Sequence, residues 1–129
     1  MANESKARVL IADDDPVIRK LLQVNFRLEG FDADVARHGK ECLEMARAKP
    51  PDAVVLDVQM PQMNGWETTL AMRQDPILER IPIVLLTARA NEADLRKGQA
   101  LGVLAHLTKP FDPSELVAVV LQALAGTPA

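Results

Sequence analysis

Residues 54–66 read VVLDVQMPQMNGW, an apolar run that ends in a carboxylate, Asp57, and continues through Pro61 to Asn64-Gly65. A short run this rich in Val and Leu is typical of a strand buried on both faces. Asn-Gly alone would suffice for a turn, so the acid at the end of the strand needs its own explanation. That explanation depends on a second acidic stretch, ADDDP at residues 12–16, and on whether the fold brings the two together.

Strand-like and helix-like patterns alternate along the whole chain. Short apolar runs predict five strands, at residues 8–13, 31–36, 52–57, 81–87 and 103–107. Amphipathic or capped segments predict five helices, at about residues 17–28, 39–49, 64–75, 91–102 and 112–126. The first helix is predicted from Val17, Leu21, Val24 and Leu28, which recur at helical spacing before Gly30.

Strands that alternate with helices imply a parallel sheet covered by helices on both faces. Right-handed crossovers leave few topologies for such a sheet. The second run alternates apolar with polar residues, as an edge strand does, and the fully apolar runs belong in the middle. We therefore expect a doubly wound, five-stranded α/β sheet of order 2-1-3-4-5, flavodoxin-like with three α/β/α layers. One domain should span residues 1–129, with a core of about residues 7–125.

Composition excludes several classes of protein. The chain of 129 residues has a net charge of −3, which gives no general attraction to nucleic acid or to anionic membranes. Its single cysteine, Cys42, precludes an internal disulfide and favours a reducing compartment. No apolar run approaches the ~20 residues that span a bilayer, and the first residues, MANESKAR, lack the apolar core of a signal peptide. We expect a cytoplasmic protein without membrane insertion or direct nucleic-acid binding.

Acidic residues follow the two strands that flank the topological switch of this sheet. Asp13 and Asp14 end the first strand and Asp57 ends the third, and ligands of such sheets bind there, beyond the carboxyl ends of the strands. Neighbouring strands lie about 4.8 Å apart, so the carboxylates should crowd one site. Such crowding raises a pKa or requires a cation, and Mg²⁺, or Mn²⁺ in its place, suits these oxygen ligands. Asp15 before Pro16 is better explained as a helix N-cap.

A hydroxyl and an ammonium are expected at the same edge of the sheet. Thr87 closes the fourth strand and Lys109 follows the fifth. Taken singly, such a threonine is more often a capping hydroxyl, and a lysine before proline is more often a solvated turn residue. Together with a metal they would surround a phosphoryl group attached to Asp57, because the lysine and the metal neutralise its oxygens and the threonine donates a hydrogen bond.

Four segments resemble the receiver domain of two-component response regulators, such as the single-domain chemotaxis response regulator, over essentially the whole chain. VLIADDDP resembles the family's acidic pair, LDVQMPQMNG its phospho-acceptor segment, LLTA its switch hydroxyl and HLTKPF its lysine-proline element. Each segment alone is a weak signal, whereas four in order at suitable spacing are highly specific. The order 2-1-3-4-5 is also that of the chemotaxis member, so topology and resemblance are not independent indications.

The resemblance implies that Asp57 accepts a phosphoryl group from a phosphohistidine, on a sensor histidine kinase or a phosphotransfer protein, or from a small acyl phosphate. It implies that Asp14 and Asp57 ligate Mg²⁺ directly with the backbone carbonyl of Gln59, and that Asp13 acts mainly through bound water. Gln59 and Arg89 stand where family members tune the phosphate lifetime. Such a domain is a phospho-acceptor switch with self-phosphorylation and autodephosphorylation chemistry, and not a conventional turnover enzyme.

The resemblance also implies how the phosphoryl group is held. Lys109 would contact the phosphate and precede a cis peptide bond to Pro110, and Thr87 would move toward the phosphoryl group. The backbone amides of Val58 and Ala88 would help to hold its oxygens. The surface of the fourth helix, fifth strand and fifth helix would then signal to an output protein that the sequence does not identify.

One switch position departs from the family pattern. The family usually has Tyr or Phe where this chain has His106, which we expect on one face of the fifth strand with Leu104, opposite Val103, Ala105 and Leu107. Imidazole is smaller than phenol and titrates near pH 6.5 when unperturbed. Coupling between the switch threonine and the output surface is therefore expected to differ from the family norm. The alternative, an exposed histidine without a role, stays open.

Three other kinds of protein fit less well. A nucleotide- or flavin-binding sheet needs a glycine-rich loop after its first strand, and ADDDP has no glycine. A haloacid-dehalogenase-like, Mg²⁺-dependent phosphohydrolase resembles D-x-D, and Gln59 stands where its second Asp belongs. An interaction scaffold would need no such cluster. We therefore expect a stand-alone receiver. Two alternatives stay open, a phosphorelay intermediate that passes phosphate to a histidine phosphotransfer protein and a receiver cut from a larger regulator.

Overall fold

The computed structural model describes residues 6–88 and 91–125. Its strands are β1 (Arg8–Ala12), β2 (Asp32–Ala36), β3 (Ala53–Asp57), β4 (Ile83–Thr87) and β5 (Ala105–Thr108). Its helices are α1 (Pro16–Leu28), α2 (Gly39–Ala48), α3 (Gly65–Arg73), α4 (Glu92–Ala100) and α5 (Pro113–Ala125). Among the helices within these two ranges, none has both the length and the apolar character that crossing a membrane requires.

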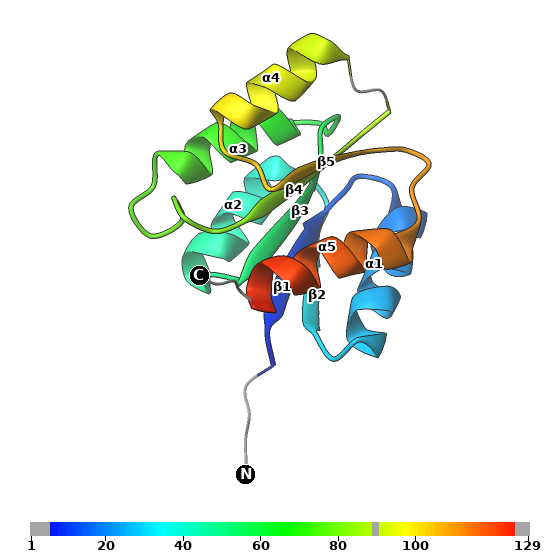
Figure 1. Cartoon of the computed structure of the whole chain (residues 1–129). Helices are drawn as coiled ribbons and strands as arrows, with labels where there is room; N and C mark the ends of the chain where they lie inside the picture. Colours follow the sequence, from blue (N-terminus) through cyan, green and yellow to red (C-terminus); the bar gives the residue numbers. More distant parts are fainter. Residues whose placement is uncertain (1–5, 89–90, 126–129) are drawn as a thin grey trace.

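The strands form one parallel sheet of order β2-β1-β3-β4-β5. Helices α1 and α5 lie on one side of the sheet and α2, α3 and α4 on the other (Figure 1). Successive strand residues point to opposite sides, so Val55 packs in the core under α1 and α5 while Leu56 packs with residues of α2 and α3. The predicted fold class and strand order are confirmed. The fully buried β3 and β4 are central, and the alternating β2 lies at an edge.

Two strands begin later than their apolar runs suggested. β4 begins at Ile83, after Pro82, which has no N–H to donate within the sheet. β5 begins at Ala105. The prediction that Val103 shares a face with Ala105 and Leu107 is wrong, because Val103 packs in the core beside α2 and α3 while the other two pack in the core beside α1 and α5. Val103 precedes the strand, so the two-residue alternation does not extend to it.

Helix α1 is capped as predicted but turns a different face to the core. Asp15 accepts the N–H of Val17 at 2.9 Å, and Pro16 occupies the first turn. The buried residues of the helix are Leu22 and Phe26. The residues whose spacing predicted the helix have exposed fractions of 41% to 77%: Val17, Leu21, Val24 and Leu28. The apolar repeat therefore located the helix correctly without identifying its buried side.

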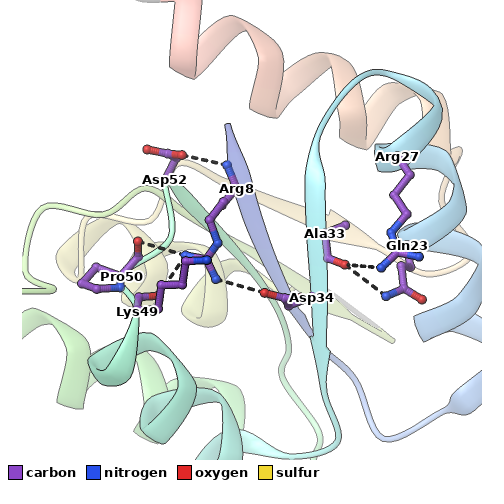
Figure 2. A network of polar contacts seen from close by, with 8 residues as sticks. All are labelled: Arg8, Gln23, Arg27, Ala33, Asp34, Lys49, Pro50 and Asp52. Carbon is purple, nitrogen blue, oxygen red and sulfur yellow. Dashed lines mark hydrogen bonds and ion pairs between the residues drawn. The ribbon is translucent and has the colours of Figure 1, made fainter. Parts of the chain in front are cut away.

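Arg8, the first residue of β1, forms hydrogen bonds to neighbouring segments at the end of the sheet opposite the carboxyl edge (Figure 2). Its guanidinium donates to the carbonyls of Lys49 (3.0 Å) and Pro50 (3.2 Å) and to the carboxylate of Asp34 (3.0 Å). Its backbone N–H donates to the carboxylate of Asp52 at 2.7 Å. These bonds join β1 to β2 and to the turn between α2 and β3, and so help to hold the register of β1 with both of its neighbouring strands.

Candidate functional site

The carboxyl ends of β1 and β3 bring three carboxylates together. Ala12 of β1 pairs with Leu56 of β3, so Asp13 and Asp57 leave adjacent strands at the same edge. One carboxylate oxygen from each of Asp13, Asp14 and Asp57 lies within 4.8 Å of the other two. Asp13 and Asp57 are 0% and 4% exposed, whereas Asp14 is exposed to solvent. The structure therefore places at one site the three acids that the sequence pattern assigned to it.

Lys109, which follows β5, supplies an ammonium to this acidic cluster. Its Nζ lies 3.1 Å from Oδ2 of Asp13 and 3.3 Å from Oδ1 of Asp57. Burial alone lowers the pKa of Lys109, but the charges of Asp13 and Asp57 outweigh burial, and the pKa is raised above its ordinary value. Lys109 is therefore a stable ammonium beside two buried acids. Its peptide bond to Pro110 is cis.

One ammonium does not balance three carboxylates. Burial raises the pKa of Asp57 to about 6, and repulsion from Asp13 adds to this effect, while Lys109 and the N–H of Gln59 act in the opposite direction. A further cation would stabilise the ionised form. Carboxylate oxygens on a cluster that is open at Asp14 are the ligand chemistry that Mg²⁺ and Mn²⁺ prefer while retaining several waters. The residues present therefore fit a divalent cation of this kind.

Replacing Lys109 by Met is expected to tighten Mg²⁺ binding about tenfold and to lower the stability of the metal-free protein. Unit charges about 4 Å apart interact by ~1–4 kcal/mol at effective dielectric constants between ~80 and ~20, so the ammonium opposes a second cation. Thermal melts in EDTA and in increasing Mg²⁺ measure both effects. The matched control is Lys20→Met on α1, because Lys20 is exposed. The same Mg²⁺ response in both variants would contradict the role of Lys109 in the cluster.

Asn64 and Gly65 start α3 directly against the end of β3. The Asn64 side chain accepts the N–H of Glu67 at 2.8 Å, and the Glu67 carboxylate accepts the N–H of Asn64 at 2.9 Å, which forms a capping box. The N–H of Gly65 donates to the carbonyl of Val58 at 2.8 Å. A Cβ on Gly65 would lie 2.6 Å from the carbonyl oxygen of Asp57. Asn64 therefore caps the helix, and Gly65 permits its close approach to the strand that carries the acid.

Gly65→Ala is expected to cost about 1–3 kcal/mol, as overpacking does, and to weaken the Mg²⁺ response by displacing Asp57. Gly30→Ala is the matched control, because Gly30 has φ of 91° and no atom within 4 Å of its added Cβ. Backbone strain alone should cost that control about 1–2 kcal/mol and leave the Mg²⁺ response unchanged. Urea unfolding with and without Mg²⁺ measures both variants. Equal Mg²⁺ responses would show that the close approach at Gly65 does not position Asp57.

The backbone amides after β3 have partners within the protein. The N–H of Val58 donates to the carbonyl of Leu86 at 2.8 Å and so extends the sheet. The N–H of Gln59 donates to Oδ1 of Asp57 at 3.3 Å. The predicted role of Val58 toward a phosphoryl oxygen would require its sheet bond to be shared or released. The amide of Gln59 is the additional donor that the sequence did not indicate, because its direction depends on the turn.

Thr87 and His106 lie on the two strands beyond β3, Thr87 at the end of β4 and His106 within β5. Thr87 is buried at the end of β4, and Ala88 follows it at the surface. Thr87 and Trp66 line the same open pocket. His106 lies on β5 against Trp66, with ring centroids 5.6 Å apart. Arg89 lies outside the described residues.

Arg19 of α1 contacts the site although no motif indicated it. Its Nη1 donates to the backbone carbonyl of Asp13 at 2.8 Å. The N–H of Asp15 donates to Oδ1 of Asp13 at 2.9 Å. The two bonds hold the backbone and the side chain of Asp13 in one orientation. Sequence spacing carried no signal for Arg19, because its side chain reaches back to a carbonyl whose direction is set by the loop.

Comparisons with known proteins agree with this geometry. A family model described as the response regulator receiver domain matches residues 9–121. The chain is 39% identical over 115 residues to the DNA-binding response regulator MtrA of Mycolicibacterium smegmatis. This match covers 89% of this chain and 49% of MtrA. It is 39% identical over 113 residues to the alkaline phosphatase synthesis transcriptional regulatory protein PhoP of Bacillus subtilis. This second match covers 88% of this chain and 46% of PhoP. The chain thus spans about half the length of the curated relatives it matches.

Solved structures of response regulators have the same fold as this chain. The chemotaxis protein CheY4 of Vibrio cholerae superimposes with a TM-score of 0.85 at 31% identity, covering 91% of this chain and 98% of that one. The receiver domain of the Francisella response regulator 1452 gives a TM-score of 0.84 at 32% identity, covering 90% of this chain and 94% of that one. The family match spans most of the chain and includes all three acids of the cluster. The chain therefore belongs to the response regulator receiver domain family.

Proposed function

We propose that the chain accepts one phosphoryl group on Asp57 in a Mg²⁺-dependent reaction and thereby switches the surface formed by α4, β5 and α5. The observation that carries the proposal is the position of the Asp57 carboxylate. It is buried at the end of β3, within 4.8 Å of oxygens from Asp13 and Asp14 and 3.3 Å from Nζ of Lys109. Membership of the receiver family supports the same reading.

In the proposed reaction a carboxylate oxygen of Asp57 attacks the phosphorus of a phosphohistidine or of a small acyl phosphate. A bond between phosphorus and this oxygen forms while the bond between phosphorus and the donor nitrogen or oxygen breaks, and the leaving group keeps the electron pair. The attacking carboxyl must be ionised, since the protonated group is a poor nucleophile. With its pKa raised to about 6, Asp57 is mostly ionised at neutral pH while remaining a better base than an ordinary aspartate.

Lys109 is placed to neutralise the oxygens of the transferred group, because it already contacts Asp57. The hydroxyl of Thr87 and the amides of Val58, Gln59 and Ala88 are the proposed hydrogen-bond donors. In this scheme the residues around Asp57 orient the phosphoryl group and neutralise its charge, and Asp57 alone forms a covalent bond to it.

The proposed metal ligands are the carboxylates of Asp14 and Asp57 and the backbone carbonyl of Gln59, with Asp13 acting mainly through water. Bound there, Mg²⁺ or Mn²⁺ would act as a Lewis acid on the phosphoryl oxygens. The position of Asp13 supports an indirect role, because its Oδ2 lies 3.1 Å from Lys109 and its Oδ1 accepts the N–H of Asp15.

The proposed donor is a sensor histidine kinase or a histidine phosphotransfer protein, in the cytoplasm. The acyl phosphate would be lost by autodephosphorylation, so the chain would act as a phospho-acceptor switch and not as a conventional turnover enzyme. We propose one receiver domain over residues 1–129, which signals to a protein partner and does not itself bind nucleic acid. Passage of the phosphate to a phosphotransfer protein is the second candidate role. The greater length of MtrA and PhoP supports a third, a receiver that belongs to a larger regulator.

Intact-mass spectrometry tests the proposal. With acetyl phosphate or phosphoramidate and Mg²⁺, the protein should gain the mass of one phosphoryl group, and EDTA should prevent the gain. The matched assay for a phosphohydrolase is sustained release of phosphate from a phosphomonoester. Sustained release without a phosphodonor-dependent adduct would overturn the proposal in favour of the hydrolase.

A further inference from the structure

His106 of β5 fills a space between α3 and α4. Its ring meets the ring of Trp66 edge-on, with centroids 5.6 Å apart and planes at 83°. On the other helix, a Cβ added to Gly98 would lie 3.8 Å from Nδ1 of His106 and 3.0 Å from a methyl group of Val103. Gly98 therefore lets the backbone of α4 approach Val103 closely, and it brings α4 to within contact distance of the ring. One imidazole thus packs against residues of two helices.

The imidazole nitrogens of His106 are buried without hydrogen bonds. Neither Nδ1 nor Nε2 has a partner within residues 6–88 and 91–125. A neutral ring leaves one donor and one acceptor unpaired, whereas a protonated ring would leave two donors and a full charge unpaired. An unpaired charge costs much more to bury than an unpaired neutral group. Burial accordingly lowers the pKa of His106.

Within residues 6–88 and 91–125, the charged groups identified near the ring come from α4. Asp94 favours the protonated ring and raises the pKa of His106, but by less than burial lowers it. Lys97 places its Nζ 4.7 Å from the centroid of the Trp66 ring and adds positive charge beside the same aromatic pair. The neighbouring strand β4 has the sequence IVLLT and contributes no ionisable group, and α3 presents Trp66. The protonated ring is therefore disfavoured in this position.

Trp66 connects this packing to the acceptor site. Besides meeting His106, it lines an open pocket together with Gln59, Thr87 and Asp94. The side chain that holds His106 in place therefore borders the residues that are proposed to surround the phosphoryl group.

We propose that His106 is a pH-sensitive latch. The neutral imidazole holds α4 and β5 against Trp66, and protonation drives the ring out of this space. With the ring outside, α4 and β5 respond less to phosphorylation of Asp57. The first part depends only on the packing of His106, and the coupling to Asp57 rests on the proposed function.

The latch is tested in the full chain carrying His38→Asn, which leaves His106 as the only histidine and keeps a capping side chain at the start of α2. An NMR titration from about pH 8 to about pH 5 spans the ordinary histidine pKa. The midpoint of His106 should lie below about 6.5, and the fluorescence of Trp66, the only tryptophan, should change with the same midpoint. Asp94→Asn should lower this midpoint further.

The matched control is His106→Phe in the same background, which keeps an aromatic ring and cannot titrate. It should abolish the part of the Trp66 response that has the midpoint of His106, while a response with the midpoint of Asp57 is unaffected. A His106 midpoint at or above about 6.5, or a Trp66 response with the His106 midpoint that survives in His106→Phe, would overturn the latch.

The coupling is tested by adding acetyl phosphate and Mg²⁺ and measuring amide chemical-shift changes in α4 and β5, divided by the phosphorylated fraction from intact mass. The normalised changes should be smaller at about pH 5.5 than at about pH 7.5 in the parent, and equal at both in His106→Phe. Equal changes in the parent would overturn the coupling. Absence of any phosphoryl adduct would instead refute the proposed function and the coupling with it, while the Trp66 titration still decides the latch.

Discussion

Asp57→Asn is expected to take up no phosphoryl group under conditions in which the wild-type protein takes up one. An uncharged amide forms no acyl phosphate, so the substitution removes the acceptor itself. Asp13 should not replace it, because its two carboxylate oxygens are engaged by Lys109 and by the N–H of Asp15. Intact-mass spectrometry after incubation with acetyl phosphate and Mg²⁺ measures the loss, under conditions that preserve a labile acyl phosphate.

The matched control for this loss is Asp32→Asn. Asp32 is exposed at the first residue of β2, at the opposite end of the sheet from the acidic cluster. This control should be phosphorylated as the wild type is. A melting curve in EDTA shows whether Asp57→Asn is folded, and it should be at least as stable as the wild type, because it lacks a buried charge that repels Asp13. A phosphodonor-dependent adduct on Asp57→Asn would point to another acceptor.

Mg²⁺ is expected to stabilise the wild-type protein by roughly 2.7 kcal/mol when its free concentration is ~100 times its dissociation constant. The metal would bind the folded cluster, where Asp13, Asp14 and Asp57 repel one another, whereas the unfolded chain holds no such cluster. Asp14→Asn should raise the free energy of unfolding in EDTA, because it removes one repelling charge. The same substitution should reduce the gain from Mg²⁺, because it removes a proposed ligand.

Thermal and urea unfolding in EDTA and in a series of Mg²⁺ concentrations measures both effects. Asp15→Asn is the matched control, since Asp15 caps α1 and asparagine is an equally good cap. Its Mg²⁺ response should equal that of the wild type. An undiminished response in Asp14→Asn would exclude Asp14 as a ligand, and a response lost equally in both variants would reflect general charge rather than a metal site.

The acidic cluster was predictable from the sequence because few physical constraints determine it. Parallel strands direct all their carboxyl ends to one edge. Right-handed crossovers leave few topologies, and the order 2-1-3-4-5, which fits the burial pattern and is shared with the chemotaxis member of the family, places β1 beside β3. Once the two strands were identified, Asp13 and Asp57 were therefore expected to lie close together. The same reasoning placed Thr87 and Lys109 at that edge, and the structure brings Lys109 to within 3.3 Å of Asp57.

Side-chain and amide directions were less predictable. In α1 both faces carry apolar residues, so spacing could not show that Leu22 and Phe26 are the buried ones. Val103 was assigned to the wrong face because β5 begins two residues later than its apolar run. Arg19 and the amide of Gln59 act through the conformations of single turns, which periodicity does not describe.

The packing of His106 depends on contacts between distant parts of the chain. Its neighbours Trp66 and Gly98 lie on two different helices, and their approach is set by the packing of those helices against the sheet. The sequence showed that a titratable ring occupies a position where the family usually has Tyr or Phe. Only the structure shows that both ring nitrogens are buried without partners among the described residues.

The central claim, that Asp57 carries the phosphoryl group, is tested most directly by chemical trapping. Borohydride reduces an acyl phosphate on aspartate to homoserine, and peptide sequencing by mass spectrometry then locates the converted residue. After acetyl phosphate and Mg²⁺, homoserine is expected at position 57 alone, and none is expected in EDTA. Homoserine at a different acid, or a phosphate found on a histidine or a hydroxyl group, would contradict the assignment of Asp57 as the acceptor.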